Sequence, residues 1–72
     1  MNYYLLESSH WPSTFEFKSK LKLNVGDCFR ITEHTGTKTY PTRFKVIEQV
    51  SSPVYKGEIV EITAINTDVD CF

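Results

Sequence analysis

Between residues 15 and 23, apolar and charged side chains alternate, and no other feature limits the fold of this chain more strongly. Because successive side chains of a β-strand point to opposite faces of the sheet, a period of two predicts a strand with one buried face. Phe15 and Phe17 begin the buried face, whereas the water-facing side carries Lys18, Lys20 and Lys22 in succession. The pattern favours a half-buried sheet over a helical fold.

Composition extends this single strand to an all-β fold. The chain has eight Thr, six Val and five Ile, which are enriched in strands, and Ala64 is its single alanine. Closing short strands into a barrel removes the exposed edges that promote aggregation. We therefore predict one domain over residues 1–72, a small five-stranded antiparallel barrel of the SH3-like kind with little or no helix. The expected strands are residues 3–6, 15–23, 28–33, 44–50 and 58–65.

Two local signals predict irregularities in the sheet. Gly26 stands where the third position of a type II turn demands a positive φ, so the chain should reverse within residues 24–27. The strand at residues 28–33 is then expected to run antiparallel beside residues 15–23. Ile47 breaks the alternation of the fourth strand, which a β-bulge near that residue would reconcile.

The length of 72 residues leaves a thin core. A domain near this size buries about 60% of the surface of its unfolded chain, so its stability is marginal. Most of the five Phe, the four Tyr and the one Trp should therefore lie in the core or against a partner. A large enzyme with a deep cofactor pocket is excluded, and a homodimer is compatible with so small a core.

The formal net charge of −1 argues against a general polyanion binder, but the charges are unevenly distributed. Residues 17–45 hold seven cations and two anions, whereas residues 46–72 hold one lysine and five acidic residues. These segments either neutralise each other across the sheet or form one basic face and one acidic edge. Residues 67–72 form a short acidic tail, and chain ends are commonly mobile.

The location of the protein is predicted from its first residues and its cysteines. The N-terminus lacks the basic stretch of a secretory signal, and no segment approaches the roughly 18 apolar residues of a membrane span. We expect a cytoplasmic protein that does not bind membranes. In that compartment Cys28 and Cys71 should stay reduced, whereas a bridge between them would add about 4 kcal/mol of stability.

No catalytic constellation is evident in the sequence. His10, His34 and the two cysteines lack metal-ligand spacing, and no glycine-rich phosphate loop is present, so we expect neither a metal nor a cofactor. His10 and His34 both fall in predicted loops. If they converged at one end of the barrel they could act as acid and base on RNA, which makes a small ribonuclease the third functional hypothesis.

Two surfaces could dock a partner. The lysines repeat about every 6.6 Å along their strand, and the cations of a neighbouring strand could join them on one face. Loop aromatics could anchor an interface. We predict a non-enzymatic accessory or inhibitor protein, such as a phage-encoded modulator of host machinery, that docks on an acidic protein surface. The alternative is an RNA-binding or single-strand-binding barrel. For the lysines themselves, the ordinary explanation is that they are solvated and only prevent edge pairing. The predicted docking residues are Lys18, Lys20, Lys22, Arg43, Lys45, Trp11 and Tyr40.

The segment Leu23-Asn24-Val25-Gly26-Asp27, followed by Phe29, Ile31 and Glu33, resembles the strand–VGD–strand core of the PUA/ASCH-like barrels. The resemblance covers about residues 21–65. It implies a PUA-like barrel that binds RNA or modified nucleotides in a cleft near Gly26 and Asp27.

Overall fold

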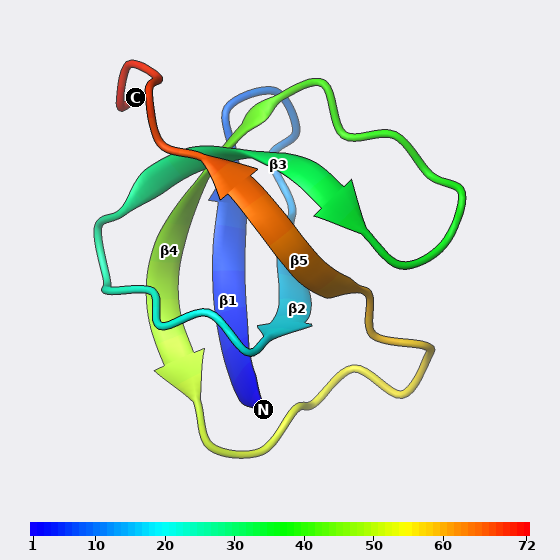
Figure 1. The fold of residues 1–72 in the computed structure, drawn as a ribbon. Coiled ribbons are helices and arrows are strands. Elements are labelled where there is room, and N and C mark those ends of the chain that lie inside the picture. Colours follow the sequence, from blue (N-terminus) through cyan, green and yellow to red (C-terminus); the bar gives the residue numbers. More distant parts are fainter.

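Five β-strands and no helix make up the regular secondary structure (Figure 1). In this computed structural model, which describes residues 1–72, the strand order around a closed barrel is β1-β2-β5-β3-β4, with β4 returning to β1. The predicted all-β class and the small five-stranded barrel are therefore confirmed. The strands are β1 (Asn2–Ser8), β2 (Thr14–Ser19), β3 (Cys28–His34), β4 (Arg43–Val50) and β5 (Glu61–Asn66).

The prediction that all pairings are antiparallel is wrong. β2 and β5 run parallel, with Lys18 opposite Glu61 and Ser19 opposite Ile62. A closed ring in which every neighbour reverses direction needs an even number of strands, so five strands must include a parallel pair. β5 is inserted between β2 and β3, and the expected pairing of β2 with β3 is therefore also wrong.

β2 ends earlier than its alternation predicts. Beyond Ser19, hydrogen bonds from side-chain hydroxyls take the place of the backbone hydrogen bonds between strands. The buried Ser19 hydroxyl donates to the carbonyl of Ile62 at 2.7 Å and accepts from the amide of Leu21 at 3.0 Å. The buried Tyr4 hydroxyl donates to the carbonyl of Leu21 at 2.8 Å and accepts from the amide of Leu23 at 3.0 Å. Leu23 is still buried, although it lies outside the strand. The segment after β2 therefore closes the end of the barrel without pairing as a strand.

The predicted turn at residues 24–27 is confirmed. Gly26 has a φ of 96°, and the amide of Asp27 donates to the carbonyl of Asn24 at 3.0 Å. The turn leads into β3 and is fixed to β4, because the amide of Gly26 donates to the carbonyl of Val46 and the amide of Val46 donates to the carbonyl of Asp27. Backbone hydrogen bonds of Gly26 and Asp27 thus attach the turn to β4.

The predicted bulge in β4 is confirmed as well. Along β1, Leu5 is opposite Glu48 while its neighbour Leu6 is opposite Val46, which leaves Ile47 as the extra residue. Ile47 is exposed and Val46 is buried, so the bulge resolves the conflict in the apolar pattern.

All five strands contribute to one core. Phe44 lies near its centre, with edge-on ring contacts to Phe17 at 5.6 Å and to Tyr40 at 5.9 Å. Such aromatic pairs contribute roughly 0.5–1.5 kcal/mol beyond their buried area. The half-buried Phe15 and Tyr40 extend the cluster towards the surface. The nine fully buried apolar residues are Tyr4, Leu6, Phe17, Leu23, Phe29, Ile31, Phe44, Val46 and Ile62.

The expectation of reduced cysteines is wrong, because Cys28 and Cys71 form a disulfide with their Cα atoms 5.3 Å apart. β5 runs antiparallel to β3, so the end of β5 lies beside the start of β3, with Asn66 opposite Arg30. The tail that follows β5 therefore meets the first residue of β3, which a sequence separation of 43 does not reveal. The tail is also held by the Arg43 side chain, which donates to the carbonyl of Asp70 at 2.7 Å.

The structure contains no helix that could cross a membrane. A disulfide does not support the predicted cytoplasmic location, since thiols are kept reduced in that compartment.

Candidate functional site

The parallel seam between β2 and β5 leaves part of β2 without a neighbour. The two strands pair at only two positions, and beyond them the amide of Lys18 donates to the carbonyl of Val60 at 3.0 Å. Alternate residues of a strand turn their backbone groups to the same side, so those of Thr14 and Glu16 face the β5 side as those of Lys18 do. No strand lies there. The edge of β2 at residues 14–17 is therefore open for pairing.

A cleft of about 600 Å³ lies against this open edge. Its volume falls in the range of about 300–1,000 Å³ typical of ligand sites. Six of its lining residues are apolar or aromatic, and the loop after β3 forms one rim. Its lining is Leu5, Thr14, Phe15, Glu16, Phe17, Thr35, Gly36, Thr37, Lys38, Tyr40, Tyr55, Glu58 and Val60.

Glu16 holds the outer wall of the cleft in place. Its carboxylate accepts hydrogen bonds from the amide of Val54, at 2.9 Å, and from the amide of Tyr55. These contacts tie the connection between β4 and β5 to β2 and leave Val54 79% exposed and Tyr55 60% exposed. Gly57 makes room for the Tyr55 ring, because a Cβ at that position would lie 2.6 Å from ring atoms. Two large apolar side chains are thus displayed beside the open edge.

Tyr40 brings a polar group to the lining of the cleft. Its ring packs edge-on against Phe17 at 5.5 Å and against His34 at 4.8 Å. Burial raises the pKa of Tyr40 above its ordinary value of 10.0, so the phenol stays protonated at neutral pH. A protonated phenol both donates and accepts hydrogen bonds, and Tyr40 can therefore orient a polar ligand group.

Trp11 lies next to the cleft rather than in it. Its ring packs edge-on on Phe15 with a centroid distance of 5.6 Å, and it is 39% exposed. The ring thus contacts the barrel on one side and stays accessible on the other, and its role in docking stays a prediction. Of the two predicted aromatic anchors, Tyr40 lines the cleft and Trp11 extends its aromatic surface beyond Phe15.

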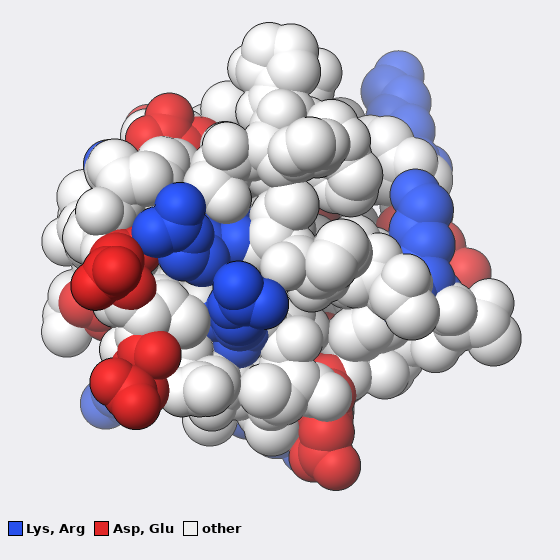
Figure 2. All heavy atoms as spheres, turned by 90° about the horizontal axis from the view of Figure 1, so that it is seen from above, with Lys and Arg blue, Asp and Glu red and all other residues white.

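The structure does not bring the predicted cations onto one face. β1 lies between β2 and β4, and along β1 Lys18 is opposite Tyr3 whereas Lys45 is opposite Glu7. Four residues along the strand and two strand widths separate them, on the order of 15 Å. On the face shown in Figure 2, basic and acidic side chains are interspersed on a largely uncharged surface. The cations form two groups, Lys18, Lys20 and Lys22 on and after β2, and Arg43 and Lys45 on β4.

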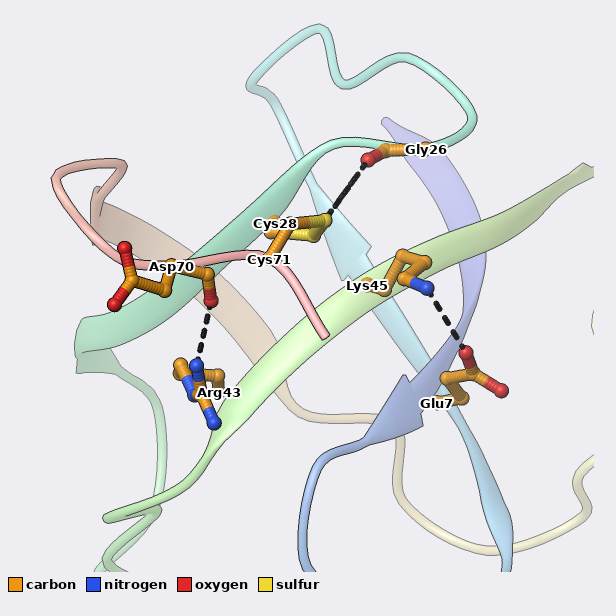
Figure 3. Close-up of a disulfide and its surroundings, with 7 residues drawn as sticks. All are labelled: Glu7, Gly26, Cys28, Arg43, Lys45, Asp70 and Cys71. Atoms are coloured by element: carbon orange, nitrogen blue, oxygen red, sulfur yellow. Dashed lines mark hydrogen bonds and ion pairs between the residues drawn. A yellow bond between two sulfur atoms is a disulfide. The ribbon is translucent and has the colours of Figure 1, made fainter.

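The β4 group is occupied by the chain itself (Figure 3). The Lys45 ammonium lies 3.5 Å from a carboxylate oxygen of Glu7 and 4.8 Å from the ring centroid of Phe72. Arg43 binds the carbonyl of Asp70 and also lies over the Phe72 ring, 5.8 Å from its centroid. A partner would compete with the tail for these two cations.

The two histidines contact different aromatic rings. His10 packs on Trp11 at 6.0 Å, whereas His34 packs on Tyr40 and its Nδ1 lies 2.7 Å from the carbonyl oxygen of Thr35. The two imidazoles thus make separate contacts, and the ribonuclease hypothesis stays a prediction. No group of three or more His, Cys, Asp and Glu residues that could hold a metal ion is present.

Two of the residues that shape the site could not be recognised from the sequence. Glu16 occupies an ordinary polar position of an alternating strand, and Gly57 is an ordinary turn glycine. Phe15 was expected in the core but is half-buried and lines the cleft, because the partner strand that would cover it is missing. Its position at the start of the alternating segment was the one sequence feature that indicated a place at the edge of the core.

Comparison with known proteins adds no relative. No protein-family model matches the chain, and no curated protein or solved structure matches it significantly. Gly26 and Asp27, which the PUA/ASCH resemblance associates with a nucleotide cleft, line neither of the two hollows in the structure. The description of the site therefore rests on the structure alone.

Proposed function

We propose that this protein is a non-enzymatic protein-binding module that takes an extended segment of its partner as an additional strand along β2. The observation that supports the proposal is the open backbone edge at residues 14–17, which lies directly over an apolar cleft. In strand addition, main-chain hydrogen bonds supply affinity and pockets for alternate side chains supply specificity. An accessory or inhibitor role agrees with this mode of binding.

The cleft defines the chemistry of the bound segment. A strand added to β2 directs every second side chain towards Phe15, Phe17 and Tyr40, which favours alternate aliphatic or aromatic residues. Lys38 on the rim favours an acidic residue at one flank of the segment. Of the predicted basic face, only Lys18 adjoins the open edge. We therefore still expect an acidic partner, but one that contacts fewer of the predicted lysines.

The alternative of nucleic-acid binding has less support. Stacking of bases along a strand needs exposed rings among several cations, but Lys38 is the single cation that lines the cleft. A phosphate-binding mode would weaken steeply as salt rises, whereas strand addition to an apolar cleft would not.

Selection from a library of random ten-residue peptides, followed by NMR titration of the labelled protein, tests the proposal. We expect selected peptides to alternate in hydropathy, to shift the amides of residues 14–17, 35–38 and Tyr55, and to slow hydrogen exchange at Glu16. Binding of a single-stranded oligonucleotide that shifts the same amides and disappears at high salt would overturn the proposal in favour of nucleic acid. Failure to select any peptide would overturn it as well.

A matched pair of variants tests the role of the backbone edge. Thr14→Pro removes an amide hydrogen that faces the cleft and leaves the pairing of β2 with β1 intact, since proline is tolerated at strand edges. Thr14→Val keeps that hydrogen. We expect Thr14→Pro to weaken peptide binding about tenfold and Thr14→Val to change it little. Equal binding by the two variants, with circular dichroism showing both folded, would mean that the peptide does not pair with β2.

A further inference from the structure

The tail forms one wall of a second hollow, on the opposite side of β4 from Glu7. Its volume is about 410 Å³, and its lining is strongly polar, with Arg30 and Arg43 on the barrel side and Asp68, Val69 and Asp70 on the tail side. Basic groups from β3 and β4 thus face acidic residues of the chain's own last segment. This hollow shares no residue with the cleft beside β2.

The contacts between the tail and the barrel beside this hollow resemble those of a bound peptide. Arg43 donates to the main-chain carbonyl of Asp70 at 2.7 Å, and the Phe72 ring receives the cationic side chains of Lys45 and Arg43 on its face. A main-chain hydrogen bond and an aromatic anchor beneath cations hold the segment, and Asp68 and Asp70 line the same hollow as Arg30 and Arg43, which favours an acidic peptide there. Figure 3 shows the tail crossing β3 and ending beside β4.

The disulfide is the strong link between tail and barrel. Cys71 is exposed and Cys28 half-buried, so a reductant can reach the bridge. The other contacts lie at the surface, where cation–π contacts and ion pairs are individually weak. A covalent link gives the tail a high effective concentration at the hollow, which falls when the link is broken.

We propose that Arg30, Arg43 and Lys45 form a binding surface for an acidic protein segment with an aromatic residue, that the tail occupies this surface as an internal substitute, and that reduction of the Cys28–Cys71 bridge opens it. The inference is independent of the proposed strand addition at β2. In a reducing compartment disulfides are usually transient and redox-sensing, which agrees with a bridge that regulates access.

The redox step balances with a dithiol as reductant. A thiolate of the dithiol attacks one sulfur of the bridge and releases the other as a thiolate, and the second thiol of the reductant then displaces the remaining cysteine. Cys28 and Cys71 together gain two electrons and two protons, and the dithiol becomes a disulfide. The tail is then held by the contacts of Asp70 and Phe72 alone.

The test uses a synthetic peptide with the tail sequence in which serine replaces the cysteine, Thr-Asp-Val-Asp-Ser-Phe, with blocked ends. Its binding is measured by NMR titration of the full chain, oxidised, reduced with dithiothreitol, and as the variant Cys71→Ser. We expect the reduced protein and Cys71→Ser to bind the peptide at least tenfold more tightly than the oxidised protein, with shifts at Arg30, Arg43 and Lys45. Equal binding to the oxidised and open forms would overturn the proposal.

Controls separate the surface from general charge effects and from unfolding. In the Cys71→Ser background, Arg43→Gln should abolish binding, whereas Lys56→Gln, on the connection to β5, should leave it unchanged. Replacing both aspartates of the peptide by asparagine should weaken it strongly. If Cys71→Ser is unfolded by circular dichroism, Phe72→Ala in the oxidised protein loosens the tail with the bridge intact, and it should bind the peptide more tightly than the unaltered protein. Binding that survives Arg43→Gln, or no gain from Phe72→Ala, would contradict the assignment.

Discussion

Two side-chain hydroxyl groups hold the backbone in place at the end of the barrel where β2 stops. Tyr4 and Ser19 are buried, and each makes two hydrogen bonds to backbone groups that no strand partner reaches. A buried backbone group that loses its partner keeps the cost of its desolvation, which is larger than the net gain from an average hydrogen bond. Substitutions at these positions should therefore act through the backbone they leave unpaired.

Tyr4→Phe tests this at nearly constant volume. It removes the partner of the buried Leu23 amide and the closer of two donors to the Leu21 carbonyl, which keeps a hydrogen bond from the Asn2 side chain at 3.4 Å. We expect a loss of about 1–3 kcal/mol in the free energy of unfolding, measured with urea. The control Tyr55→Phe removes a hydroxyl from an exposed ring and should cost less than about 0.5 kcal/mol. Similar losses in the two variants would show that the Tyr4 hydroxyl is not the cause.

Tyr40 gives the site a titration signal of its own. Because burial raises its folded-state pKa above 10.0, the folded protein holds this proton more tightly than the unfolded chain. The resulting stability is complete below about pH 10 and is lost as pH rises through the raised pKa. Titration of phenolate ultraviolet absorbance should show a component with its midpoint above pH 10 that Tyr40→Phe removes. A spectrum whose high-pH component survives that substitution would assign it elsewhere.

At the scale of elements, the arrangement depends on how five strands close a ring. β2 and β5 meet along two residue pairs, and the parallel seam is the shortest of the five pairings. The cleft opens where this seam ends, and Glu16 bridges the gap from β2 to the connection before β5. The cleft thus results from the way the barrel closes, and the Glu16 carboxylate positions its outer wall.

Glu16→Ala should loosen the outer wall of the cleft without unfolding the barrel. We expect the amides of Val54 and Tyr55 to exchange with solvent at least tenfold faster, since both lose their acceptor, while amides of β1 and β4 keep their protection. Hydrogen exchange followed by NMR gives both readings in one experiment. Glu48→Ala, which removes an exposed carboxylate from β4, is the control and should change neither set. Unchanged exchange at Val54 and Tyr55 would show that Glu16 does not hold the wall.

The strands themselves could be predicted from local patterns, whereas their order could not. Alternation located β2 and β3, Gly26 located the turn, and the misplaced Ile47 located the bulge, since each depends on neighbouring residues alone. The insertion of β5 beside β2 depends on pairings between distant segments, which no local pattern encodes. The parity of a closed ring does require one parallel pair among five strands, but it does not say which.

The same distinction applies to the site. Tyr40 was predicted as an anchor from its place beside turn residues, and it lines the cleft. The predicted union of Lys18 with Arg43 and Lys45 assumed that their strands were neighbours, and β1 separates them. Glu16 became a site residue only because the connection before β5 passes its carboxylate. Side-chain chemistry was visible in the sequence, but proximity across the barrel was not.

At the scale of the whole molecule, a small core is supplemented by a covalent link. Nine buried apolar residues form the core, and the bridge from Cys28 to Cys71 restrains the unfolded chain over more than half of its length. The disulfide thus joins the start of β3 to the tail and makes the stability of the protein depend on the redox state of its surroundings.

Cys71→Ser should lower the free energy of unfolding by about 2–4 kcal/mol, since a loop of this length restricts the unfolded chain strongly. Urea unfolding with and without dithiothreitol measures the effect. The unaltered protein should lose a similar amount on reduction, and Cys71→Ser should not respond to the reductant. Ser52→Ala, at an exposed position outside the core, serves as a control. Stability that is independent of reductant in the unaltered protein would contradict the role of the bridge.

The position of β5 has a consequence for partly folded states. β2, β1, β4 and β3 are neighbours in that order without β5, so a chain in which β5 has not yet docked is an open four-stranded sheet with two bare edges. Only the docking of Glu61–Asn66 supplies the strand that fills the gap. Until then the sheet is prone to pair with the edges of other chains, so slow docking of this one strand favours aggregation during refolding.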